Sequence, residues 1–315
     1  MISRGLVAAE ATAAHTTTQA PPFAAPKQLA LLPVNAYRYL EGEKLRSLRA
    51  RTRPAADMTH QTLQDRPKAG LFVTCLVDLV RPSVGFAAAR LIELAGCDVV
   101  VPTGQTCCGQ PAYNSGDRAD AVALARQTVK AFAGCDYVVV PSGSCAGQLK
   151  IHVPRLLAGT EDEAQANLFA SRVFELMSFL HDERKLVEVP GRFDGTVTYH
   201  DSCSGLRELH IKTQPRALLS KVEGLKLREM ADCETCCGFG GLFSIKFPDI
   251  SNAIVERKAA NVQASGADLL LSGDLGCLLN MAGKLNRSGA AIACRHVAEV
   301  LAGEFSAPPI TKGEA

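Results

Sequence analysis

Tryptophan is absent from this 315-residue sequence, and aromatic residues make up only 5% of it. No aromatic platform for stacking bases or sugars therefore stands out. The formal net charge of +2 is too small to indicate nucleic-acid binding driven by counterion release. No stretch approaches the roughly 18–20 consecutive apolar residues that a membrane-spanning helix needs. We therefore expect neither a nucleic-acid partner nor a transmembrane segment.

Cysteine, in contrast, is abundant, with twelve residues in the chain. No secretory signal is recognisable, and the cytosol keeps thiols reduced, so a framework of disulfide bonds is disfavoured. Thiolates that are not paired with one another are available as metal ligands. We expect a cytoplasmic protein that uses many of its cysteines to bind metal.

The chain divides into four parts by composition. Residues 1–66 are rich in Ala, Thr, Pro and Arg, which predicts a disordered or non-native extension. Translation from Met58 instead of Met1 is one explanation, and an organellar transit peptide is a less favoured one. Residues 67–190 and 191–304 each form one structured repeat, and residues 305–315 form a flexible tail.

Short apolar runs alternate with amphipathic stretches from Ala69 onward. The pattern predicts six strands, at Gly70–Cys75, Asp98–Val101, Tyr137–Val140, Thr196–His200, Leu225–Met230 and Asp268–Leu271. It predicts helices between them, at Gly85–Ala95, Asp117–Phe132, Glu163–His181 and Ile250–Ala264. Strand–helix alternation of this kind is typical of an α/β fold with parallel sheets.

Eight cysteines follow one template that occurs twice. The first copy consists of Cys75, the pair Cys107 and Cys108, and Cys145; the second consists of Cys203, the pair Cys236 and Cys237, and Cys277. Equivalent positions are 128, 129, 129 and 132 residues apart. Neither chance nor core packing would produce this regularity, so the sequence indicates an internal duplication.

Each copy supplies four sulfurs at predicted strand ends or loops, where α/β sheets gather functional residues. Four thiolates suit either zinc or an iron–sulfur cluster. Adjacent cysteines bind one small tetrahedral ion only with strain, but they can bind different irons of a cluster, so iron–sulfur ligation is favoured and zinc is the alternative. Gly109 and Gly238 follow the cysteine pairs, and we expect them to let the backbone lie against an inorganic core.

The remaining candidates are less specific. Cys97, Cys135 and Cys294 lie beside or within apolar runs and fit buried core positions. Cys233 forms a C-x2-C pair with Cys236, so it is a possible alternative ligand. His200 could donate a hydrogen bond to a cluster sulfur or could simply pack. No catalytic residue is identified.

These residues resemble a known family. Its motifs are Phe72-Val73-Thr74-Cys75, Cys107-Cys108-Gly109-Gln110-Pro111, Ser142-Gly143-Ser144-Cys145, Tyr199-His200-Asp201-Ser202-Cys203 and Cys236-Cys237-Gly238-Phe239-Gly240-Gly241. They are similar to the "CCG" cysteine-rich domain proteins, and most of all to the lactate-utilization branch, the small iron–sulfur subunits of three-component L-lactate oxidation systems. The resemblance covers about residues 69–303. The cysteine-rich subunit of heterodisulfide reductase and the iron–sulfur subunits of glycolate oxidase and anaerobic glycerol-3-phosphate dehydrogenase contain similar domains.

The resemblance implies an oxidoreductase subunit that transfers electrons during oxidation of lactate to pyruvate. It implies two [4Fe–4S] clusters, and as partners a ferredoxin-type iron–sulfur subunit and a third small subunit. The heterodisulfide reductase relatives use five cysteines per repeat for noncubane clusters, but here Ser142 and Asp274 occupy the fifth positions. Either residue could supply an oxygen ligand, and cubane and noncubane clusters both stay open. A glycolate oxidase subunit, a heterodisulfide-reductase-like subunit and a zinc-stabilised, non-redox scaffold are the alternatives.

Overall fold

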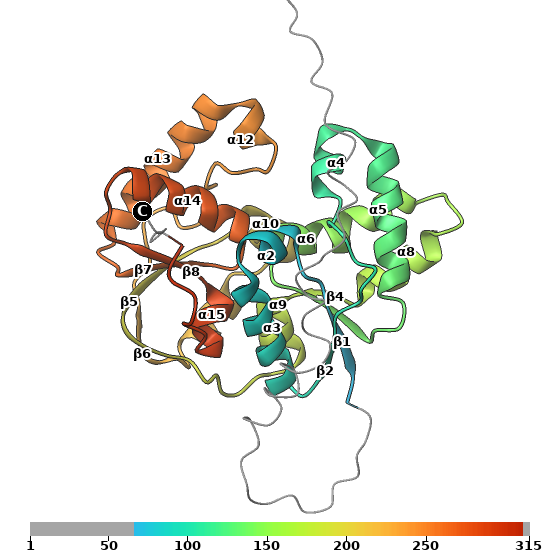
Figure 1. Ribbon diagram of the computed structural model, residues 1–315, viewed down its shortest axis with the longest axis horizontal. Coiled ribbons are helices and arrows are strands. Elements are labelled where there is room, and N and C mark those ends of the chain that lie inside the picture. The colour runs from blue at the N-terminus through green and yellow to red at the C-terminus, as the bar shows by residue number, and fades with distance from the viewer. Residues whose placement is uncertain (1–65, 311–315) are drawn as a thin grey trace, which may run out of the picture.

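The computed structural model describes residues 66–310, and Figure 1 shows them as two α/β halves that lie side by side. The first sheet has the strand order β2-β1-β3-β4 and the second has the order β6-β5-β7-β8. All neighbouring strands are parallel. The predicted α/β class with two parallel sheets is confirmed, and the identical order of strands shows the duplication at the level of topology. The predictions for residues 1–65, including a start at Met58, lie outside the described residues.

All six predicted strands are present, with ends that shift by a few residues. The first sheet contains β1 (Lys68–Leu71), β2 (Asp98–Val100), β3 (Tyr137–Val140) and β4 (Val173–Glu175), and the second contains β5 (Arg192–His200), β6 (Glu223–Leu227), β7 (Leu269–Ser272) and β8 (Ala293–His296). The sequence did not predict β4 and β8, the fourth strand of each sheet. Both are too short, at three and four residues, for their alternation to stand out.

The helix predicted over Glu163–His181 was wrong. Helix α8 (Glu163–Ser171) ends before β4, which is followed by α9 (Leu176–Ser178) and a π-helical turn, η3 (Phe179–Glu183). The apolar spacing of the two flanking helical segments runs through the strand and conceals it. The buried Glu175 ends the strand, because its carboxylate accepts hydrogen bonds from the amides of Met177 and Ser178.

The other three predicted helices are confirmed as α3 (Pro82–Leu94), α5 (Arg118–Ala131) and α13 (Pro248–Ala264). Besides α3 and α5, the first half contains α2 (Cys75–Val80), α4 (Gln110–Ser115), α6 (Gly143–Gly147), η2 (Gln148–His152) and α7 (Val153–Leu157). The second half contains α10 (Cys203–Leu209), α11 (Thr213–Leu219), α12 (Phe243–Lys246), α13 (Pro248–Ala264), α14 (Leu275–Arg287) and α15 (Val297–Ala302). Within the described range, none of these helices has the length and apolar character to cross a bilayer.

The first sheet separates two apolar cores. Phe72, Val138 and Val140 face a core that lies within the first half, under α5, α7 and α8. Leu71 and Val139 face the opposite side and join a larger core that continues into the second sheet. Alternate residues of a strand point to opposite faces, so a single sheet can serve both cores. The shared core joins the halves into one packed unit.

The contacts between the halves come in equivalent pairs. Helix α3 of the first half packs against α15 of the second, and α11 of the second packs against α9 of the first. Likewise α6 contacts α10, and α14 contacts α2. Helices α2, α3, α6, α9 and α10 lie near the middle of the molecule in Figure 1. Because each contact has a counterpart with the roles of the halves exchanged, the halves are related by an approximate two-fold axis.

Candidate metal centre

The template cysteines lie in the segments that follow the strands. Cys75 and Cys203 are the first residues of α2 and α10, shortly after β1 and β5, and Cys145 and Cys277 lie in the first turns of α6 and α14, after β3 and β7. The two pairs lie in the loops that follow β2 and β6. The prediction that Cys75 ends a strand was wrong. Strand β1 stops at Leu71, and the Thr74 hydroxyl caps α2 by accepting a hydrogen bond from the amide of Val77 at 3.3 Å.

Within each half, the four thiols meet in the same order. Cys75 and Cys107, Cys107 and Cys108, and Cys108 and Cys145 lie close enough for one thiol to shift the pKa of the next. In the second half, the same holds for Cys203 and Cys236, Cys236 and Cys237, and Cys237 and Cys277. We call these groups the first and second sulfur sets. Sulfurs that are distant in sequence are thus close enough in space to share one metal group.

Each sulfur set stabilises one thiolate. Hydrogen bonds from Cys108 and Cys75 lower the pKa of Cys107 to about 3, and those from Cys203 and Cys237 lower the pKa of Cys236 to about 2. The donating thiols of Cys75, Cys108, Cys203 and Cys237 have raised pKa values for the same reason. Concentrated thiols with one stabilised thiolate form a donor set that metal would complete.

Helix starts lie beside each sulfur set. The first turns of α2, α6, α10 and α14 contain template cysteines. The unpaired amides of a helix N-terminus favour negative charge, so these turns would stabilise a negatively charged metal group bound there. The amides of Gly238 and Phe239 also point at sulfurs, those of Cys236 and Cys237, at 3.3 and 3.5 Å.

The backbone conformation gives Gly109 and Gly238 a requirement of their own. Both adopt left-handed backbone conformations, with φ of +85° and +84°, which side chains disfavour. A Cβ atom at Gly238 would lie 2.7 Å from the carbonyl oxygen of Ser251, in α13. The glycine therefore allows the chain to reverse direction against a helix immediately after the cysteine pair.

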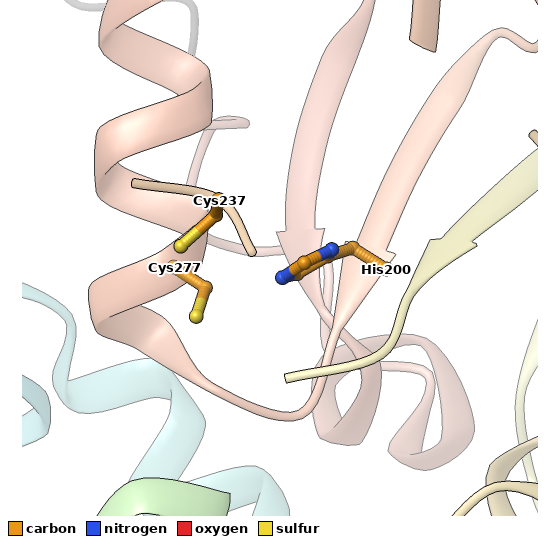
Figure 2. Close-up of side chains that lie close together, drawn as sticks. All are labelled: His200, Cys237 and Cys277. Atoms are coloured by element: carbon orange, nitrogen blue, oxygen red, sulfur yellow. The ribbon is translucent and has the colours of Figure 1, made fainter. Parts of the chain in front are cut away.

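His200 lies beside the second sulfur set. It ends β5, is completely buried, and points toward Cys237 and Cys277, as Figure 2 shows. One ring nitrogen and the two sulfurs all lie within 4.8 Å of one another. Burial, followed by the nearby charge of Lys258, lowers the pKa of the imidazole to about 3, so the ring is neutral.

Ser142 and Asp274, which occupy equivalent positions in the two repeats, contact each other. The Ser142 hydroxyl donates to Asp274 Oδ2 at 3.0 Å, and the amide of Ser144 donates to the same oxygen at 2.9 Å. Asp274 Oδ1 caps α14 by accepting hydrogen bonds from the amides of Gly276 and Cys277 at 3.1 and 3.3 Å. Four hydrogen bonds saturate a carboxylate, so this geometry favours a bridge between the halves over metal ligation.

Replacing Asp274 should therefore destabilise the protein strongly. Asp274→Ala removes a helix cap and two hydrogen bonds from the other half, and we expect a loss of about 3–5 kcal/mol in the free energy of unfolding. Urea denaturation followed by circular dichroism under anaerobic conditions measures this loss. Asp117→Ala is the matched control, since Asp117 caps α5 by accepting from Asp120 at 3.1 Å within one half, and we expect it to cost about 1 kcal/mol. Equal losses in the two variants would contradict the bridging role.

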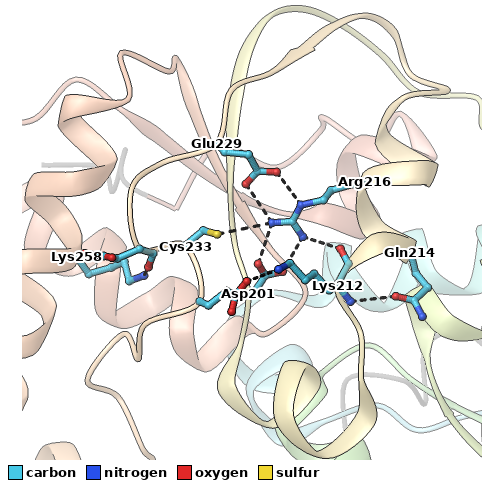
Figure 3. A network of polar contacts seen from close by, with 9 residues as sticks. Asp201, Lys212, Gln214, Arg216, Glu229, Cys233 and Lys258 are labelled. Atoms are coloured by element: carbon cyan, nitrogen blue, oxygen red, sulfur yellow. Dashed lines mark hydrogen bonds and ion pairs between the residues drawn. The ribbon is translucent and has the colours of Figure 1, made fainter.

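Cys233 belongs to a separate polar network, drawn in Figure 3. Its sulfur accepts from Arg216 Nη2 at 3.9 Å. The same guanidinium binds the buried Asp201 through two bonds of 2.8 Å and Glu229 through bonds of 2.6 and 3.0 Å. This network holds the loop before the Cys236 pair against α11, which gives Cys233 a partner other than metal.

Lys258 is a residue that the sequence did not single out. It lies in α13, is only 2% exposed, and its Nζ atom donates to the carbonyl of Asp232. Burial lowers its pKa, whereas Cys233 and Cys237 act in the opposite direction. The residue thus places a buried amine near the second sulfur set. A lysine at helical spacing is normally a surface residue, so no sequence signal marks it.

Cys97, Cys135 and Cys294 lie away from the sulfur sets. All three are buried, at 0%, 5% and 0% exposure, within the apolar cores. The prediction that they are core residues is confirmed.

Comparisons with known proteins agree with the duplication. The sequence profile of the CCG cysteine-rich domain family matches residues 69–150 and 197–282. Lactate utilization protein A of Geobacillus kaustophilus is 46% identical over 235 residues, which cover 74% of this chain and 98% of that protein. Lactate utilization protein A of Shouchella clausii is 44% identical over 231 residues, which cover 73% and 97% of the two chains.

Among solved structures, a hypothetical protein from Helicobacter pylori is similar, with a TM-score of 0.53 and 13% sequence identity. The match covers 76% of this chain and 51% of that one. At this identity the likeness concerns the fold alone.

Proposed function

Because this chain belongs to the family of CCG cysteine-rich domain proteins that includes the lactate utilization A proteins, we propose that it is an iron–sulfur, electron-transfer subunit of a system that oxidises L-lactate to pyruvate. The coarser role, in lactate utilization, is supported by relatives at 40–46% identity. The finer role rests on the chemistry of the two sulfur sets.

The observation that carries the proposal is the repeated convergence of four thiols around an adjacent cysteine pair. In each set the pair supplies neighbouring sulfurs, and one single cysteine lies on either side of it. This donor set fits a [4Fe–4S] cluster, which is held by four thiolates. A bound cluster would accept and release single electrons. We assign one cluster to Cys75, Cys107, Cys108 and Cys145, and the other to Cys203, Cys236, Cys237 and Cys277.

The residues around the two sulfur sets suit electron transfer. Helix starts at α2, α6, α10 and α14 and the amides of Gly238 and Phe239 stabilise the negative charge of a thiolate-ligated group. The sets are only half covered, because Cys75, Cys107 and Cys145 of the first and Cys203 and Cys236 of the second retain partial exposure. Partial exposure would allow electrons to pass to a partner protein.

Three further proposals follow from the same assignment. The partners would be a ferredoxin-type iron–sulfur subunit and a third small subunit of the lactate utilization system. The protein would be located in the cytoplasm, because its twelve cysteines form no disulfide bond among the described residues and the cytoplasm keeps thiols reduced. Residues 67–190 and 191–304 would each form one repeat that holds one cluster.

A reconstituted system tests the function. With the two partner subunits present and air excluded, we expect lactate to bleach the visible absorbance of this protein, with one pyruvate formed for every two electrons that the oxidised clusters accept. Cys236→Ser should remove about half of the absorbance that this chain contributes to the bleaching, since one of its two sets would lack a ligand, and Cys135→Ala, a core cysteine, should preserve all of it. Bleaching by glycolate but not by lactate would reject the substrate, and a colourless protein would reject electron transfer.

A further inference from the structure

His200 has no hydrogen-bond partner for either ring nitrogen among the residues that the structure describes, although it is fully buried. The carbonyl of Cys233, which accepts from the amide of Asp201, also lies close enough to raise the pKa of the ring, so it accounts for one ring nitrogen at most. Burial of a polar group without a partner is unfavourable, because the group loses its hydrogen bonds to water and gains none in return. Nearly all buried polar groups in proteins are therefore paired, and an exception indicates a missing water, ion or ligand. At least one nitrogen of His200 thus requires a partner that the polypeptide does not provide.

The direction of the ring supplies that explanation. It points from the end of β5 into the second sulfur set, with a nitrogen in the same 4.8 Å group as the sulfurs of Cys237 and Cys277 (Figure 2). Neutral imidazole is a common ligand for iron and zinc. A buried ring nitrogen that lies among thiols and lacks a hydrogen-bond partner has the properties of a metal ligand.

The first half has no histidine at the position equivalent to His200. The spacing of 128 residues that relates Cys75 to Cys203 places Phe72 at the position of His200. Phe72 is also fully buried, but its ring packs against Phe132 with centroids 5.7 Å apart, in the apolar core next to Cys108. One position of the duplicated fold therefore has an apolar ring in the first half and a nitrogen donor in the second.

Two other side chains near the second set are already engaged. Both oxygens of Asp274 accept two hydrogen bonds each, and the sulfur of Cys233 accepts from Arg216. Of Asp274, Cys233 and His200, the histidine is the one whose hydrogen-bonding capacity is unused. It is therefore the best placed of the three to bind a metal.

We propose that a ring nitrogen of His200 binds the metal group held by Cys203, Cys236, Cys237 and Cys277. The second site would then have five protein ligands, four sulfurs and one nitrogen, and the first site would have four sulfurs. For the identity of the bound group, this inference rests on the proposed function. It makes the two sites chemically different despite their common fold.

X-ray absorption at the edge of the bound metal tests the proposal directly, because imidazole gives a scattering pattern that sulfur does not. The protein should carry Cys107→Ser and Cys108→Ser, so that the signal comes from the second site. We expect the imidazole pattern in this background and its loss in His200→Gln. His152→Gln should retain it, since His152 pairs with Glu208 at 3.0 Å outside both sulfur sets.

Iron and sulfide measured on the same samples separate this proposal from the proposed function. Iron and sulfide without an imidazole pattern would reject His200 as a ligand and leave the cluster in place. An imidazole pattern with zinc and no sulfide would support His200 and reject electron transfer, and absence of any metal would reject both. If His200→Gln does not fold, His200→Cys should retain the metal in an all-sulfur shell. In that case the spectrum of the protein that carries only Cys107→Ser and Cys108→Ser decides whether imidazole binds the metal.

Discussion

Protein purified without air is expected to contain about eight iron atoms and eight sulfides per chain, and Cys107→Ser or Cys236→Ser should each remove about half of both. Each substitution takes away the cysteine that carries the stabilised thiolate of its set. The sets draw on cysteines from different halves, so the loss of one cluster should leave the other intact. Colorimetric iron and acid-labile sulfide assays, referred to protein concentration, measure the change.

Two outcomes would contradict this expectation. Zinc in place of iron, without sulfide, would replace the redox assignment with a structural metal site. Complete loss of iron on either single substitution would show that the sets do not bind metal independently. Cys97→Ala and Cys135→Ala are the matched controls, because these residues are buried cysteines outside both sets, and neither should lower the iron content.

Glu299→Ala should cost about 3–5 kcal/mol in the free energy of unfolding, since it breaks a buried ion pair and leaves a buried charge unpaired. Arg81, in the first half, donates from Nε to both oxygens of Glu299 at 2.9 and 3.1 Å. The hydroxyl of Ser83 adds a bond of 2.6 Å to the same carboxylate, and the amide of His296 adds one of 3.0 Å. Anaerobic urea denaturation measures the loss.

The position of Glu299 explains the size of this effect. Its side chain is completely buried where α3 meets α15, and it also completes the cap of α15. Asp162→Ala is the matched control, because Asp162 pairs with Arg126 at 2.6 Å on the surface, with side chains 27% and 48% exposed. Exposed pairs contribute about 0–1 kcal/mol. A comparable loss from both substitutions would show that burial of the pair between the halves is not what matters.

The sequence predicts much of the fold because its strongest signal, the duplicated cysteine template, is local and regular. Strands such as β3 and β7 are continuous apolar runs, as buried parallel strands should be, and they lie where predicted. The strand preceding Cys75 was placed too late because Phe72 and Val73 are apolar, although β1 ends at Leu71. Apolar character alone does not distinguish the end of a strand from a buried loop.

Contacts between the halves could not be predicted in this way. Nothing near Ser142 in the sequence indicates a hydrogen bond to Asp274, and nothing near Arg81 indicates an ion pair with Glu299, because these partners are 132 and 218 residues apart. The orientation of His200 also depends on the packing around β5. Such contacts are set by how the two sheets are placed in space, which periodicity does not describe.

The bond between Ser142 and Asp274 also bears on how such a chain could have arisen. The two residues occupy the same place in their repeats, so their contact lies on the approximate two-fold axis. In an ancestral homodimer of one repeat, that place would face an identical copy of itself. Two aspartates there would repel each other, whereas two serines would lack the shared carboxylate. Fusion of the copies into one gene frees each position to mutate separately, and a serine opposite an aspartate is a pairing that only the fused form can encode.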